Sequence, residues 1–183
     1  MMMTRKERVR NALQFQPVDR IPTQINYTAV TAHHLAAHFN IPLTNLPGYL
    51  DNHLLRVDLS YPGQLSEDGR IRTDWWGVGF DTQEEGYFAA VNPLGENANL
   101  DSYPWPDPHD LALLVAAQEA IRADTGQHFI VPNFGFALFE RAWSLRGFEQ
   151  FFIDLAADPG YAGELLDRIT EICLLYTSDA ADE

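Results

Sequence analysis

Hydrophobic positions recur at helical spacing over much of the chain. Near its start, Val9, Ala12 and Leu13 form an apolar stripe, and Thr4 followed three residues later by Glu7 is the capping-box pattern of a helix start. Apolar spacing and composition predict further helices over residues 28–39, 46–57, 110–123, 138–158 and 159–172. The fourth of these is one helix or two that meet at Gly147. The last is expected to bury one face, formed by Tyr161, Leu165, Leu166 and Ile169.

Two apolar stretches, residues 57–62 and 128–134, instead predict strands. The helix over residues 110–123 lies between them and has the length that a crossover between parallel strands requires. We therefore predict an α/β fold with parallel strand pairing. Residues 68–95 carry turn residues at short spacing with aromatic residues between them, which predicts hairpins inserted between the two strands.

Composition and charge indicate which kinds of molecule the chain is expected to bind. The chain has 183 residues, the size of one ordinary domain, and its 46% hydrophobic content is ample for a packed core. Its formal net charge of -14 repels phosphate backbones and anionic lipid, so neither nucleic acid nor a membrane surface is expected as a partner. A local basic pocket for a small anion remains compatible with that average.

The location is predicted from what the sequence lacks. No apolar run approaches the roughly 20 residues that a bilayer-spanning helix needs, and no apolar segment follows the basic N-terminus as in a secretory signal. Cys173 is the single cysteine, so no internal disulfide can form. A cytoplasmic location is the expectation.

Four phrases, in their order and spacing, resemble the uroporphyrinogen decarboxylase (URO-D) superfamily, which includes the cobamide-dependent methyltransferases. They are TRKERVRNALQFQPVDRIP from residue 4, DWWG from residue 74, LDSYPWPDP from residue 100 and FERAWSLRGFEQFFIDLAADP from residue 139. The resemblance covers residues 4–172. It implies the N-terminal part of a (β/α)8 TIM barrel, which is incomplete because such a barrel takes roughly 250 residues.

The last eleven residues, CLLYTSDAADE, differ in character from the rest. They keep no helical period, and they resemble the translated adapter of transposase-based sequencing libraries. The family resemblance ends just before them. We therefore expect residues 1–172 to be the barrel portion and residues 173–183 to be a non-native tail; a frayed native terminus is the alternative.

The resemblance implies that the parent protein is an enzyme, a porphyrinogen decarboxylase (a lyase of porphyrin biosynthesis) or a methyltransferase that uses a corrinoid protein and a thiol. The decarboxylases carry an Arg-Gln-Ala-Gly-Arg motif in their first strand. Here the matching stretch is PTQINYTAV, with Gln24, Asn26 and Tyr27 and no arginine. The acidic groups of a porphyrinogen would lack bidentate partners, which favours methyl transfer. Asn26 and Tyr27 become candidate substrate-binding residues.

Four further site residues follow from the resemblance. Asp58 matches the central carboxylate of the family, which implies a catalytic role in accepting pyrrole N–H groups and stabilising a developing cation; a turn or cap is the alternative. Asn133 and Phe134 end a strand at the expected barrel mouth, which implies contact with substrate; a cap or turn is the alternative for Asn133. Trp143 stands where the decarboxylases have an active-site tyrosine, so it lines the site or packs in the core.

No metal site or cofactor is visible in the sequence. His34 and His38 have a zinc-binding spacing, but no third ligand is suggested nearby, so an exposed helix face is expected. The methyltransferases of the superfamily hold zinc in their C-terminal half, so zinc and a corrinoid are implied only for the full-length parent. The partners implied are a small-molecule substrate, either a tetrapyrrole or a methyl donor, and a corrinoid protein.

Two other interpretations stay open at this level. The polypeptide is a truncated gene product with no activity of its own, or it is a small acidic module whose aromatic loops bind a ligand. Trp75 and Trp76 are the residues that such a loop would use, although packing of the loop explains them equally.

Overall fold

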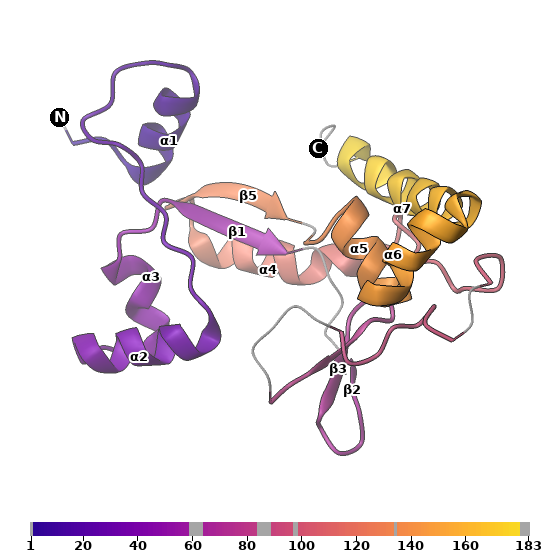
Figure 1. The fold of residues 1–183 in the computed structure, drawn as a ribbon. Helices are drawn as coiled ribbons and strands as arrows, with labels where there is room; N and C mark the ends of the chain where they lie inside the picture. Colours follow the sequence, from indigo (N-terminus) through magenta and orange to yellow (C-terminus); the bar gives the residue numbers. More distant parts are fainter. Residues whose placement is uncertain (1, 59–63, 84–88, 97–98, 134, 180–183) are drawn as a thin grey trace. The chain divides into compact units, whose positions relative to one another are not determined.

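The computed structural model describes residues 2–58, 64–83, 89–96, 99–133 and 135–179, the last five by their backbone alone. The chain divides into two compact units. The first unit consists of Met1–Asp58 and Ala116–Asn133, and the second of Leu59–Val115 and Phe134–Glu183. Figure 1 shows the elements of both.

The first two helices of the chain begin at side-chain caps. Helix α1 spans Arg5–Leu13, and both hydrogen bonds of the predicted capping box between Thr4 and Glu7 are present. Helix α2 spans Ala29–Phe39, begins at Thr28 and ends at Asn40, whose φ of 53° is left-handed. The 3₁₀ turn Leu43–Asn45 leads into the short helix α3, Leu46–Tyr49. Asp110 caps a 3₁₀ turn, Leu111–Leu114, at the end of a segment of the second unit. The chain continues into α4, Val115–Asp124, which belongs to the first unit from Ala116 onward.

The first unit contains a parallel pair of strands, as the α/β prediction requires. Strand β1, Leu54–Asp58, pairs along its whole length with β5, Phe129–Asn133. The register sets Leu54 opposite Phe129 and Asp58 opposite Asn133, so both strands end at the same edge (Figure 1).

Two predictions for these strands need correction. The helix expected over residues 46–57 stops at Tyr49, and β1 begins at Leu54 instead of residue 57. The chain turns at Asp51, whose φ is 54°, and the Asn52 amide then bonds both the N–H (2.9 Å) and the C=O (3.1 Å) of Ile25. The second correction concerns β5, which is half-buried with Pro132 exposed, whereas the apolar sequence of residues 128–134 is typical of a fully buried strand.

The hairpins predicted for the middle of the chain are confirmed in the second unit. Strands β2 (Gln64–Leu65), β3 (Ile71–Thr73) and β4 (Gly79–Asp81) form an antiparallel sheet in that order. Gly79 is required there, because a Cβ at this position would lie 2.8 Å from Cγ2 of Ile71.

Three helices complete the second unit: α5 (Leu138–Arg146), α6 (Phe148–Ala157) and α7 (Pro159–Asp179). The first two meet at Gly147, whose φ of 95° interrupts the helical path. The core of this unit is formed by side chains of the sheet, the following loop and these helices, among them Trp76, Val78, Leu94, Leu145, Phe151, Leu165 and Ile169.

Helix α7 runs past the expected end of the native sequence. Leu165 and Ile169 are buried on its inner face, as predicted, and Ile172 continues that face. Cys173 is half-buried against the same core, so the helical period that was expected to stop at residue 172 extends at least one residue further. The adapter origin of residues 173–183 stays a prediction.

Within the part of the chain that the structure describes, no helix has both the length and the apolar character needed to cross a membrane.

Candidate functional site

The register of β1 and β5 brings two of the predicted site residues together. Asp58 and Asn133 are the last residues of adjacent parallel strands, and the Asn133 amide Nδ2 donates a hydrogen bond to Asp58 Oδ1. Nε of Arg56, two residues earlier on β1, lies 3.4 Å from the same oxygen. The carboxylate is therefore oriented by one neutral and one charged donor.

The atom of this pair that is available to a substrate is Oδ2 of Asp58. The Asp58 side chain is 61% exposed, and its Oδ2 accepts no hydrogen bond from the described residues. An oriented carboxylate with one free oxygen accepts an N–H group or stabilises a nearby positive charge. This arrangement suits the catalytic role that the family resemblance implies for Asp58.

The other predicted site residues of the first unit lie in the segment before α2. Asn26 is exposed and Tyr27 is half-buried there, and among the described residues neither forms a hydrogen bond with Asp58 or Asn133. The preceding residues lie beside the start of β1, because Thr23 O accepts from His53 N (3.1 Å) and Gln24 Oε1 accepts from Leu54 N (3.1 Å).

The two predicted site residues of the second unit are Trp143 and Phe134. Trp143 lies on α5 and is buried in the core, with its ring edge-to-face against Phe148 at 5.7 Å between centroids. This position fits the packing alternative for Trp143. Phe134 lies outside the described residues.

The histidines of α2 are placed as expected. His33, His34 and His38 are all exposed. In the described ranges, no three His, Cys, Asp or Glu side chains gather in a way that would hold a metal ion.

The two tryptophans in the loop before β4 differ in burial. Trp76 is 1% exposed and packs in the core, with the Arg141 guanidinium 4.9 Å from its ring centre. Trp75 is half-buried and lines a cavity of about 540 Å³ with Tyr103.

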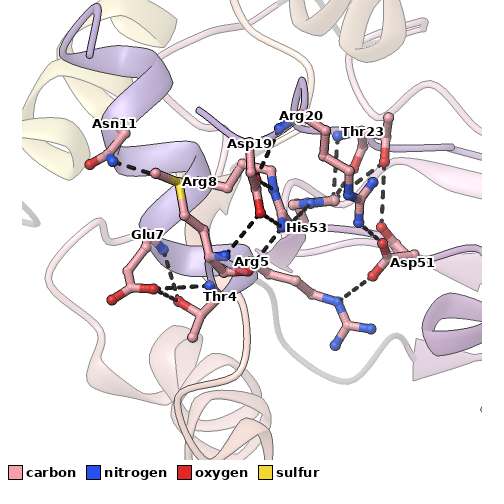
Figure 2. A network of polar contacts seen from close by, with 11 residues as sticks. Thr4, Arg5, Glu7, Arg8, Asn11, Asp19, Arg20, Thr23, Asp51 and His53 are labelled. Carbon is pink, nitrogen blue, oxygen red and sulfur yellow. Dashed lines mark hydrogen bonds and ion pairs between the residues drawn. The ribbon is translucent and has the colours of Figure 1, made fainter. Parts of the chain in front are cut away.

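A buried cation–histidine contact in the first unit was missed by the sequence analysis. Arg8 is 2% exposed on α1; its Nε and Nη2 donate to the Asp19 carboxylate at 2.6 and 3.0 Å, and its Nη1 lies 2.7 Å from Nε2 of the fully buried His53 (Figure 2). We call Arg8, Asp19 and His53 the Arg8 network. A signal was present, because Arg8 precedes Val9 on the inner face of α1, and a cation on an apolar face requires an internal partner.

The contacts of His53 define its protonation state. Arg8 can only donate, so Nε2 of His53 is an acceptor and the proton of the neutral ring belongs on Nδ1, which lies 3.0 Å from the carbonyl oxygen of Thr23. Burial lowers the pKa of His53, as do the positive charges of Arg20, Arg8 and Arg5, against the opposing bond to Thr23. Hydrogen bonds from Arg8 hold the pKa of Asp19 well below its usual range.

We expect the first unit to lose stability as the pH falls below about 6.5. Near that pH the unfolded chain protonates His53, whereas the folded unit keeps the ring neutral because its pKa is lowered. The unfolded state then binds more protons, and the loss grows until the pH reaches the lowered pKa of the folded ring. Hydrogen exchange of peptides from α1 and β1, corrected for intrinsic rates between pH 7.5 and 5, measures this loss.

His53→Gln is the control, because glutamine has similar hydrogen-bonding groups and does not titrate. The variant is expected to have a flatter stability profile between pH 7.5 and 5. Equal slopes in the two proteins would show that another group is responsible.

Comparison with known proteins does not identify a relative of the chain. No family model, curated protein or solved structure matches the chain. The resemblance to the URO-D superfamily therefore stays a prediction, and the strand-end pair of Asp58 and Asn133 is the observation that bears on function.

Proposed function

We propose that this chain is the N-terminal portion of a (β/α)8 barrel enzyme of the URO-D superfamily, with Asp58 in its active site. The observation that supports the proposal is the joint position of Asp58 and Asn133 at the carboxyl ends of two adjacent parallel strands. Barrel enzymes of this kind build their active sites at that edge.

The order of the segments also supports a barrel. Residues 23–25 lie beside the start of β1, and β1 pairs with β5, so these three segments of the first unit are neighbours in the order of the chain. The helical segments α2 and α4 precede β1 and β5. Neighbouring positions for successive strand segments are what a barrel requires, because each helix returns the chain to the next strand.

For the reaction of the parent enzyme, we favour methyl transfer involving a corrinoid protein and a thiol over porphyrinogen decarboxylation. The segment that would hold the arginine motif of the decarboxylases presents Gln24, Asn26 and Tyr27. Neutral side chains cannot neutralise the carboxylates of a porphyrinogen, whereas a guanidinium group binds each of them through two bonds.

In either reaction the contribution of this chain is the oriented carboxylate. Asn133 and Arg56 hold Oδ1 of Asp58, which leaves Oδ2 to accept a substrate N–H or to face a developing positive charge.

The test uses the longer reading frame from the source genome, expressed as one protein. We expect Asp58→Asn to reduce kcat/KM by about 10²–10³-fold, the usual effect of removing one oriented electrostatic group. Methyl transfer from a methylated corrinoid to a thiol and decarboxylation of a porphyrinogen are assayed in parallel. Asp167→Asn, the same change at an exposed position of α7, is the control.

Two results would overturn the proposal. Unchanged turnover of the Asp58→Asn protein would remove Asp58 from the active site. A reading frame that continues without any barrel-like strands would remove the barrel itself.

A further inference from the structure

A cavity of about 400 Å³ lies in the first unit beside the start of α1. Its wall includes the first turns of α1 together with Asp51 and Gln127, which precede β1 and β5 respectively. The cavity therefore lies at the amino ends of the two strands, whereas Asp58 and Asn133 lie at their carboxyl ends. It is a different place from the proposed active site.

The charge of this cavity is opposite to that of the chain. The whole chain has 12 Lys and Arg against 26 Asp and Glu. Two carboxylates, Glu7 and Asp51, line the cavity, against five cationic side chains: Arg5, Lys6, Arg8, Arg10 and Arg20. We call this cavity the α1 basic pocket. A positive pocket in an acidic protein attracts small anions while the overall charge repels large ones.

Part of this positive charge has no internal partner. Nε of Arg5 donates to one oxygen of Asp51 at 2.8 Å, and Arg20 donates to the other. Neither Lys6 nor Arg10 has an ion-pair partner among the residues that the structure describes, and Lys6 is partly buried. An incoming anion supplies the counter-ion that the Lys6 ammonium lacks among the described residues.

We propose that the α1 basic pocket binds a small phosphorylated molecule. Two guanidinium groups already hold the two oxygens of one carboxylate, Asp51, and the same donor geometry matches the oxygens of a phosphate group (Figure 2). Lys6 supplies a charge that no described carboxylate pairs with, and Arg10 shares its charge with Glu7. The volume admits a small molecule.

The experiment is a calorimetric titration of the chain with pyrophosphate at low ionic strength. We expect saturable binding that weakens about tenfold or more in Lys6→Gln, because a hydrogen bond to a charged group is lost. Arg122→Gln removes the same charge from an exposed position of α4 outside the pocket and is expected to leave the affinity nearly unchanged. Circular dichroism verifies that each variant is folded.

In a second pair of variants, the proposal predicts an increase in the affinity for pyrophosphate. Asp51→Asn releases Arg5 and Arg20 for the ligand and is expected to bind pyrophosphate more tightly than the unmodified chain. Asparagine suits the left-handed φ of 54° at this position, so the turn is retained. Glu119→Gln, an equal change of charge on the exposed face of α4, is the control and is expected to have little effect.

Three results would overturn the proposal. The first is the absence of saturable heat with pyrophosphate. The second is an equal loss of affinity in Lys6→Gln and Arg122→Gln, which would indicate only the diffuse field of the protein. The third is binding of citrate at least as tight as that of pyrophosphate, which would contradict the preference for phosphate.

Discussion

Replacing Arg146 with methionine is expected to lower the free energy of unfolding of the second unit by about 3–5 kcal/mol, the usual cost of removing one partner of a buried ion pair. Arg146 and Asp154 have side-chain exposures of only 11% and 9%, and Nε of Arg146 lies 2.6 Å from Oδ2 of Asp154. Nη1 of the same guanidinium donates to the carbonyl oxygens of Leu94 (2.7 Å) and Gly95 (3.0 Å). The variant leaves a buried carboxylate and two carbonyl groups without this donor.

The pKa values of the pair agree with this view. The hydrogen bond with Asp154 raises the pKa of Arg146 against the effect of burial. Burial alone would raise the pKa of Asp154, but hydrogen bonds from Arg146 and Gln150 keep it below its ordinary value. The charged form of the carboxylate therefore depends on the arginine.

Tryptophan fluorescence during urea unfolding measures this effect selectively. All four tryptophans of the chain, at positions 75, 76, 105 and 143, belong to the second unit. Arg168→Met is the control, because Arg168 pairs with Asp101 at 3.1 Å on the surface and such pairs contribute at most about 1 kcal/mol. Arg146→Met combined with Asp154→Leu is expected to recover much of the lost stability, because no charge is then left unpaired.

A loss below about 1 kcal/mol in Arg146→Met would contradict the prediction, since it would place the pair in the range of surface ion pairs.

Phe151→Ala is expected to destabilise the second unit by about 3–5 kcal/mol, the range for removal of a buried aromatic ring. Phe151 is 1% exposed on α6 and packs in the core that Leu165 and Ile169 of α7 also line. Removal of the ring leaves a cavity in this core. The neighbouring side chains fill that cavity only in part, because they are held in place by their other packing contacts. The measurement is again urea unfolding followed by tryptophan emission.

The neighbouring residue provides a matched control. Phe152 is 47% exposed and contacts the rings of Phe148 (5.0 Å) and Phe139 (5.8 Å) near the surface. Phe152→Ala removes the same group and is expected to cost at most about 1.5 kcal/mol, the contribution of aromatic pairing. Equal losses in the two variants would mean that α6 does not bury the face that carries Phe151.

The elements that the sequence predicts well are those that depend on local signals. Thr4 and Glu7 form the capping box, Thr28 begins α2, and Gly147 separates α5 from α6. Each of these features is decided within a few residues, either by a side chain that satisfies free N–H groups or by a φ angle that glycine accepts readily.

The errors occur where a distant partner decides the structure. Leu54 follows a stretch with helical composition, but it lies in a strand because Phe129, far along the chain, is its partner. Similarly, Cys173 extends the buried face of α7 because the core of the second unit is there to cover it. The local sequence pattern indicates which secondary structure a segment prefers, and tertiary contacts can override that preference.

The same limit applies to the site residues. Asp58 and Asn133 were each proposed on their own, and only the register of the two strands makes them hydrogen-bond partners. The Arg8 network joins α1, the loop after it and the residue before β1, so no short motif contains it. The α1 basic pocket is likewise an assembly of separate segments.

The separation between the two paired strands has a consequence for biosynthesis. Asp58 and its partner Asn133 are 75 residues apart, and the chain between them folds largely into the second unit. At a translation rate of about 5–20 residues per second, β1 leaves the ribosome on the order of 4–15 seconds before β5. During that interval the backbone of β1 lacks the strand that completes it, so chaperone capture or pairing with a neighbouring nascent chain competes with native folding at this point.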